Sequence, residues 1–283
     1  SGTIGWAAAA AVDCAFLALL CAAIAREIVA GRNWRNLRIW GAVVLLLAAN
    51  VLFHLEAHLT GDAAYARRFA LAVIVVLVML IGGRIVPSFT HTFLLRQGAV
   101  RLPRTFDRFD GISMAVSCGA MVGWIIAPEN QMVGLALIAA SGMNFARLSR
   151  WAGNRASSEV LVAILHVAYA FVPIGFLLSG LATFVPTIPL SAGLHAWAVG
   201  AIGGMTLAVM TRASLGHTGR ALYAGWGTQI LYAALLLAVM TRIGAALVPQ
   251  WNLVLLLVAA SAWLVAFLGF AAIYGPALVR PRL

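Results

Sequence analysis

The feature that most constrains the fold of this chain is a succession of long apolar segments. Runs of roughly 20 apolar residues recur along the 283-residue sequence, and this is the length of helix that crosses the hydrocarbon core of a bilayer. Only 10% of the residues are charged, whereas soluble domains carry about 25%. We therefore predict an all-α polytopic membrane protein, with one transmembrane domain over residues 1–283. The predicted spans cover residues 4–25, 39–60, 66–86, 109–127, 131–149, 158–180, 189–213, 219–242 and 250–275.

The arginines predict the orientation of these nine spans. All 19 basic residues are arginines. Sixteen of them, Arg147 included, follow the odd-numbered spans, and only Arg67, Arg68 and Arg242 lie on the other side. Because positive residues concentrate on the cytoplasmic side, we predict the N-terminus outside and the C-terminus in the cytoplasm. The arginines lie between the spans rather than in one patch, so we expect no nucleic-acid partner despite the net charge of +11.

One stretch between two predicted spans has a different character. Residues 87–108 mix phenylalanine, leucine and arginine and are too polar to cross the bilayer. Such a composition is typical of segments that lie in the plane of the membrane surface. We predict that 87–108 is a cytoplasmic interfacial segment.

Histidines are the residues that could carry chemistry. Of the six in the chain, four lie within predicted spans: His54, His58, His166 and His195. An ionisable side chain is costly inside a bilayer and usually functional, and neutral imidazole binds both metal ions and haem iron. The plainer alternative for each histidine is a hydrogen bond to a neighbouring helix, and the same alternative applies to Asp13 near the centre of the first span.

Depth suggests which histidines could act together. His54 and His195 each lie about six residues inside the outer end of a span, or roughly 9 Å deep. Two imidazoles at equal depth on facing helices could ligate one haem iron from both sides. His58 lies one helical turn nearer the outer surface and could bind a metal ion.

A second group of candidates gathers near the predicted inner surface. Met210 offers a thioether that suits copper(I), and arginines there could hold carboxylates such as haem propionates. Plain packing of Met210 and solvent exposure of the two loop histidines are the alternatives. The group comprises His91, His166, His217, Met210, Arg84, Arg212 and Arg220.

The span that leads from His195 to Met210 also carries closely spaced glycines. Gly200 and Gly204 are four residues apart, with Gly203 beside them. This small-xxx-small spacing lets another membrane helix approach the backbone. We predict close packing of a neighbouring helix at these glycines.

Four segments of the chain resemble the signature segments of the NnrS family. They are NVLFHLEAH (50–58), GGRIVPSFT (82–90), LHVAYAFVP (165–173) and HAWAVGAIGGMTLAVMTRASLGHTGR (195–220). The resemblance implies a multi-pass protein of the bacterial inner membrane that contains haem b and copper and is linked to nitric oxide, nitrosative stress and denitrification. It places the family's histidines on His54, His166, His195 and His217, and its arginines on Arg84, Arg212 and Arg220.

The chain departs from the family pattern at two points. Family members usually have about twelve spans and an early Trp-His-x-His-Glu-Met-like segment, so this chain resembles either their C-terminal nine spans or a shortened member of the family. Relatives also commonly carry asparagine shortly after the Phe-Thr pair, where this chain has His91 and Thr92.

Three functional classes follow from these observations. The first is a haem- and copper-binding protein that takes nitric oxide as its ligand and works beside a respiratory or denitrification complex. The second is a permease in which Asp13, Asn50 and His166 line a pathway. The third is an accessory subunit of a respiratory complex.

Overall fold

Helices account for the regular structure of this protein. The computed structural model describes residues 5–279, and no strand occurs in that range. Nine helical segments within it are long and apolar enough to cross a membrane. The predicted all-α class and the number of spans are therefore confirmed for residues 5–279, while the sides on which the two termini lie stay a prediction.

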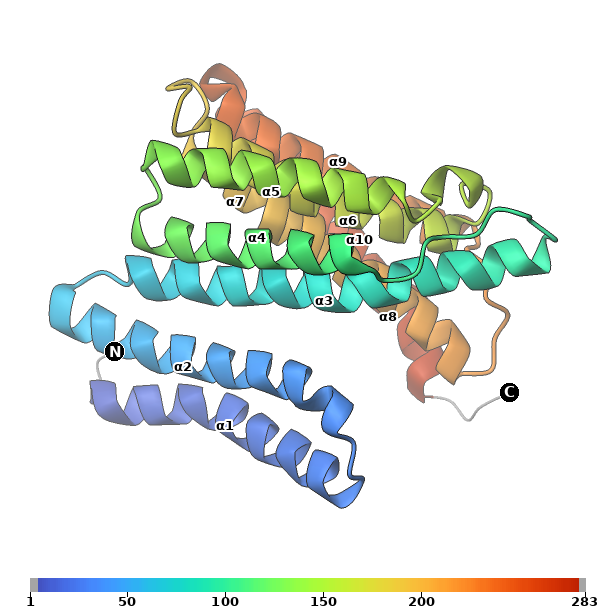
Figure 1. Ribbon diagram of the computed structural model, residues 1–283, viewed down its shortest axis with the longest axis horizontal. Helices are drawn as coiled ribbons and strands as arrows, with labels where there is room; N and C mark the ends of the chain where they lie inside the picture. Colours follow the sequence, from blue (N-terminus) through green and yellow to red (C-terminus); the bar gives the residue numbers. More distant parts are fainter. Residues whose placement is uncertain (1–4, 280–283) are drawn as a thin grey trace. The chain divides into compact units, whose positions relative to one another are not determined.

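The elements follow one another along the chain, and the longest connection between them, residues 97–107, joins α3 to α4 (Figure 1). One span is composite, because α7, the π-helix η3 and α8 run on without a break from Leu190 to His217. The elements are α1 (Trp6–Ala30), η1 (Trp34–Asn36), α2 (Leu37–Thr60), α3 (Ala64–Arg96), α4 (Arg108–Ile126), α5 (Gln131–Ser149), η2 (Gly153–Arg155), α6 (Val160–Leu181), α7 (Leu190–His195), η3 (Ala196–Gly203), α8 (Gly204–His217), α9 (Trp226–Leu247), η4 (Pro249–Trp251) and α10 (Asn252–Val279).

The predicted end of the third span, at residue 86, is wrong. Helix α3 continues through Pro87 to Arg96, so it has 33 residues and is about 50 Å long, against a hydrocarbon core of about 30 Å. Proline removes one backbone N–H from the helix, but inside a membrane bundle neighbouring groups can compensate for it. Residues 87–96 therefore belong to a helix rather than to a separate segment. The interfacial position predicted for 87–108 stays a prediction.

The eighth span begins later than predicted, at Trp226 rather than at residue 219. Gly219 has a φ of +74°, a left-handed conformation that glycine adopts readily and that commonly ends a helix. The N–H of Arg220 then bonds back to the carbonyl of Leu215 at 3.0 Å. Residues 218–225 consequently form a loop.

The chain folds as two compact units. The first contains α1, α2, the start of α3 up to Leu77, and residues 121–127 at the end of α4. In this unit α1 and α2 pack side by side (Figure 1). The second unit contains residues 78–120 and everything from Pro128 onward.

Helix α6 is the centre of the second unit. It packs against α5, α7, η3 and α8. A larger share of its residues is buried than in any other membrane-length helix within 5–279. The predicted close approach at the glycines is confirmed here. A Cβ added at Gly204 would lie 2.8 Å from the Cβ of Ala168, and one at Gly200 would lie 2.4 Å from the ring of Phe171. Both glycines therefore face α6 rather than lipid.

Candidate functional site

An imidazole–carboxylate pair joins the first two helices. The Nε2 atom of His54 on α2 lies 2.9 Å from Oδ2 of Asp13 on α1. Since a carboxylate only accepts hydrogen bonds, Nε2 is the donor, and in a neutral imidazole Nδ1 then keeps its lone pair. The interhelical hydrogen bond considered for both residues is present. It is also the arrangement in which metal-binding histidines are commonly held, with the second ring N–H donated to a carboxylate.

His58 lies one turn from His54 on the same helix. Its ring stacks on Trp6 of α1, with the centroids 4.0 Å apart and the planes 16° from parallel. Histidines four residues apart project from one helix face, so α2 offers two imidazoles on the side that faces α1. Glu56, between them in sequence, has a different role: its carboxylate accepts the backbone N–H groups of Tyr65 and Ala66 at 3.0 and 2.8 Å, which are among the first N–H groups of α3.

His166 on α6 is enclosed by α3 and η2. Its Nε2 lies 2.8 Å from Oγ1 of Thr90, and that hydroxyl donates to the carbonyl of Val86 at 2.8 Å. A hydroxyl has only one proton, so Nε2 of His166 is the donor to Thr90. The Nδ1 atom lies against Gly153, where an added Cβ would come within 2.5 Å of it. Both ring nitrogens are thus engaged or covered, and ligation by His166 would require the ring to move.

His195 stands at the last position of α7, directly before η3. It is half-buried and makes no hydrogen bond to another residue of the described chain. The charge of Arg242 on α9 acts on it electrostatically. The eight-residue π-helix that follows, Ala196–Gly203, was not predicted. Such segments are rare and often mark functional sites.

The inner candidates do not form one cluster. Arg212 lies with its guanidinium 4.0 Å above the ring of Phe89, a cation–π contact between α8 and α3. Met210 is partly buried, whereas His217, Arg220 and Arg84 are exposed. No hydrogen bond or ion pair links these residues to one another within 5–279, and no group of three His, Cys, Asp or Glu side chains gathers anywhere in that range. The predicted inner site therefore stays a prediction.

The most deeply buried charged residue within 5–279 is one that the sequence analysis counted only among the arginines at the end of the fifth span. Arg147, near the end of α5, is only 2% exposed. Its Nε donates to Oδ1 of Asp110 at 2.9 Å, and its Nη1 lies 3.1 Å from the hydroxyl of Tyr169. Nη1 also lies 3.4 Å from the carbonyl of Met79 and 3.2 Å from the sulfur of Met114. One guanidinium thus connects α3, α4, α5 and α6.

Two glycines of α3 make room for this arrangement. A Cβ added at Gly83 would lie 2.1 Å from Nη2 of Arg147, and one added at Gly82 would lie 2.9 Å from the ring of Tyr169. A sequence signal for the site existed. Asn144 precedes Arg147 by three residues, which puts both polar side chains on one face of an apolar helix.

The network extends in both directions from Arg147. The Tyr169 hydroxyl donates to Oδ1 of Asn144 at 3.4 Å, and Nδ2 of Asn144 donates to Oγ of Ser117 at 2.8 Å. Toward the loop before α4, the Arg150 side chain pairs with Asp107 and holds the pKa of that carboxyl below its ordinary value of 3.8. The cluster is a buried cation with its counter-ions, and its hydrogen bonds join α3, α4, α5 and α6.

Comparison with known proteins places the chain in a family. A family model described as NnrS protein matches residues 1–282. This chain belongs to the NnrS family. Membership fits a nitric-oxide-related membrane protein, and the NnrS fold seen here is a bundle of membrane-length helices. No curated protein and no solved structure matches the chain.

Proposed function

We propose that this NnrS-family protein binds haem b and copper in the bacterial inner membrane, and that it handles nitric oxide or protects the cell from nitrosative stress. Haem iron and copper(I) both bind nitric oxide, which is the chemistry that these groups supply. Family membership and intramembrane histidines on α2 and α7 support the proposal. Its working partner would be a respiratory or denitrification complex of the same membrane.

The Asp13–His54 pair is the observation that carries the metal-binding part. Nδ1 of His54 is bonded to the ring carbon that joins the imidazole to Cβ, so the backbone is close to it. A single metal ion therefore reaches Nδ1 more easily than the wide, planar haem does. His58 adds a second imidazole one turn away. We therefore propose that copper binds at His54 and His58, with Asp13 fixing the His54 ring through its 2.9 Å contact.

The haem part of the proposal centres on His195. Its imidazole is not committed to a hydrogen bond within residues 5–279, so either ring nitrogen is available to iron. Ligation of the same iron by His54 and His195 is the alternative that the equal-depth argument raised.

The experiment is a visible spectrum and a copper analysis of the purified protein. We expect a Soret band and bound copper in the parent protein. His195→Ala should lose the Soret band. His54→Ala and His58→Ala should lose copper and keep the Soret band. Tyr223→Ala, at an exposed ring in the loop of residues 218–225, is the control and should keep both.

Other outcomes are equally informative. A parent protein with neither Soret band nor copper contradicts the proposal and favours a permease. A Soret band that shifts in His54→Ala as well as in His195→Ala would assign both histidines to the haem iron. Asp13→Asn should weaken copper binding by about 10–100-fold, the usual effect of losing a residue that orients a ligand.

A further inference from the structure

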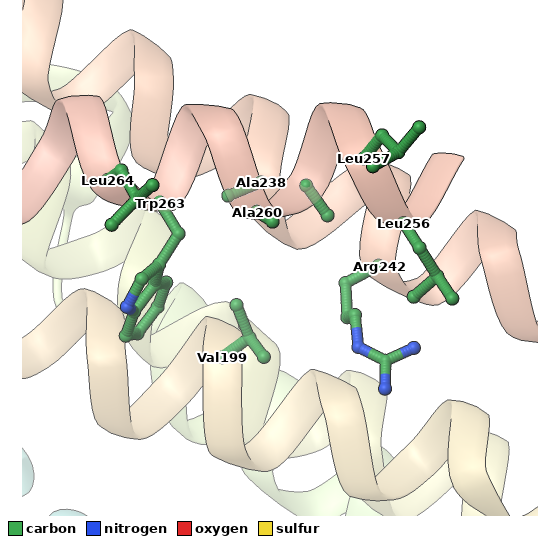
Figure 2. A pocket seen from close by; sticks show the side chains of 9 residues that line it. Val199, Ala238, Arg242, Leu256, Leu257, Ala260, Trp263 and Leu264 are labelled. Carbon is green, nitrogen blue, oxygen red and sulfur yellow. The ribbon is translucent and has the colours of Figure 1, made fainter. Parts of the chain in front are cut away.

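A groove lies between the last three membrane segments of the second unit. It encloses a volume of about 600 Å³. Figure 2 shows Arg242 at one end of the opening and Trp263 at the other, with Val199 between them. The groove is apolar apart from the guanidinium of Arg242 and the indole N–H of Trp263. Its lining residues are Val199, Ala238, Arg242, Leu256, Leu257, Ala259, Ala260, Trp263 and Leu264.

Arg242 brings a positive charge to this groove, and no ion pair to it occurs among residues 5–279. All eight acidic residues of the chain lie within residues 5–279, and none of them forms an ion pair with Arg242. The imidazole of His195, on which the charge of Arg242 acts, cannot neutralise a cation. An arginine within a membrane helix is costly unless it is paired or reaches the interface, so an anion from outside the chain would stabilise it.

The groove opens toward the lipid. Leu257 and Leu264 line it, yet their side chains are 61% and 55% exposed, so they form a rim on the outer face of α10. In a transmembrane segment such a face meets acyl chains. The occupant therefore enters from the bilayer, and its body is a hydrocarbon chain.

The guanidinium and the apolar wall of the groove lie at different depths in the membrane. Arg242 lies five residues before the end of α9, or about 7–8 Å from that end. Trp263 lies eleven residues into α10, which begins on the same side, or about 16–17 Å deep. A ligand that fills the groove thus has an acidic group near the membrane interface and a chain that runs inward.

We propose that this groove binds an anionic phospholipid, with the phosphate on Arg242 and one acyl chain between η3, α9 and α10. A zwitterionic lipid offers the same chain but carries its own ammonium beside the phosphate, so it competes poorly for the guanidinium. Basic pockets between membrane helices are known to recognise anionic headgroups in this way.

The test measures lipids retained by the intact protein. The protein is purified in mild detergent, exposed to equal amounts of phosphatidylglycerol and phosphatidylcholine with identical chains, and weighed by native mass spectrometry. We expect the parent protein to retain phosphatidylglycerol about fivefold better, the effect of one basic side chain near the membrane surface on a lipid with a net negative charge. Arg242→Gln should bind both lipids equally. Arg67→Gln is the matched control, because Arg67 already pairs with Asp62 at 2.8 Å, and it should keep the preference.

A second variant tests the groove itself and leaves the charge in place. Ala260 lines the groove at an exposed position, so Ala260→Phe fills the cavity without burying a larger side chain in the core. It should lose both lipids. Equal retention of the two lipids by the parent protein would overturn the proposal, as would an undiminished preference in Arg242→Gln. Retention of a free fatty acid in place of a phospholipid would overturn the assignment of the headgroup.

Discussion

The ion pair between Arg147 and Asp110 offers the sharpest test of how the second unit is held together. The two side chains are 2% and 6% exposed, so removal of either one leaves the other charge buried. Breaking a pair of this kind typically costs about 3–5 kcal/mol of folding free energy. We expect both Arg147→Met and Asp110→Asn to destabilise the protein, but not equally.

The remaining partners determine the order of the two effects. After Arg147→Met, Asp110 still has Nη1 of Arg150 at 3.6 Å and the N–H of Asp107 at 3.2 Å, so the loss should lie near the lower end of that range. After Asp110→Asn, Arg147 keeps only neutral neighbours, such as the hydroxyl of Tyr169 and the ring of Trp151. That variant should lose about 4–5 kcal/mol.

The assay is reversible unfolding in mixed micelles, with the double variant completing a thermodynamic cycle. Because the double variant buries no unpaired charge, its loss should be smaller than the sum of the two single losses by at least 1 kcal/mol or so. Arg155→Met, at an exposed arginine close in sequence, is the control and should change stability by less than about 0.5 kcal/mol. Additive single losses, or a milder Asp110→Asn, would refute the reasoning.

Three further predictions concern other parts of the chain. Gly204→Leu should insert in the membrane but lose about 10–100-fold in haem affinity, because the new side chain displaces α6 at Ala168; full haem occupancy would contradict this. Arg150 keeps the pKa of Asp107 below 3.8. Their ion pair should therefore stabilise the fold fully above about pH 4 and lose that contribution as the pH falls through the lowered pKa. Asp107→Asn should lack this part of the acid unfolding transition, and an unchanged transition would contradict the assignment. Reporter fusions should read cytoplasm and outside at alternate loops, and any two reversed results would overturn the predicted orientation. The cytoplasmic fusion sites are Arg38, Arg101, Arg155 and Arg220, and the outside sites are Gly61 and Thr187.

Helix boundaries show where reasoning from the sequence stops. Hydropathy located each span, because a bilayer selects for length and apolar composition without regard to partners. It failed after residue 86, since the residues that follow are too polar to cross the bilayer, whereas α3 runs on through Pro87 to Arg96. The start of α9 was missed for the converse reason: the loop at 218–225 follows from the conformation of Gly219, and apolar residues on both sides conceal it.

The candidate sites divide in the same way. The sequence identified the histidines and the glycines of the seventh span, because an ionisable group or a missing side chain is conspicuous within an apolar run. It could not tell which atoms face one another. The bond from His54 to Asp13 and the enclosure of His166 by Thr90 and Gly153 depend on contacts between segments far apart in the chain.

The sequence by itself determined that this is a helical membrane protein, how many spans it has, and which residues are too polar to lie there without a reason. Only the tertiary structure decided what those reasons are. Arg147 is the clearest case. Its position near a helix end predicts a side chain exposed at the membrane surface. In the structure it is buried, where it bonds to Asp110 and Tyr169 and fills the space left by the missing side chain of Gly83. The physical reason is that hydropathy is a property of each segment, whereas the stability of a buried charge depends on the partners that other helices bring to it.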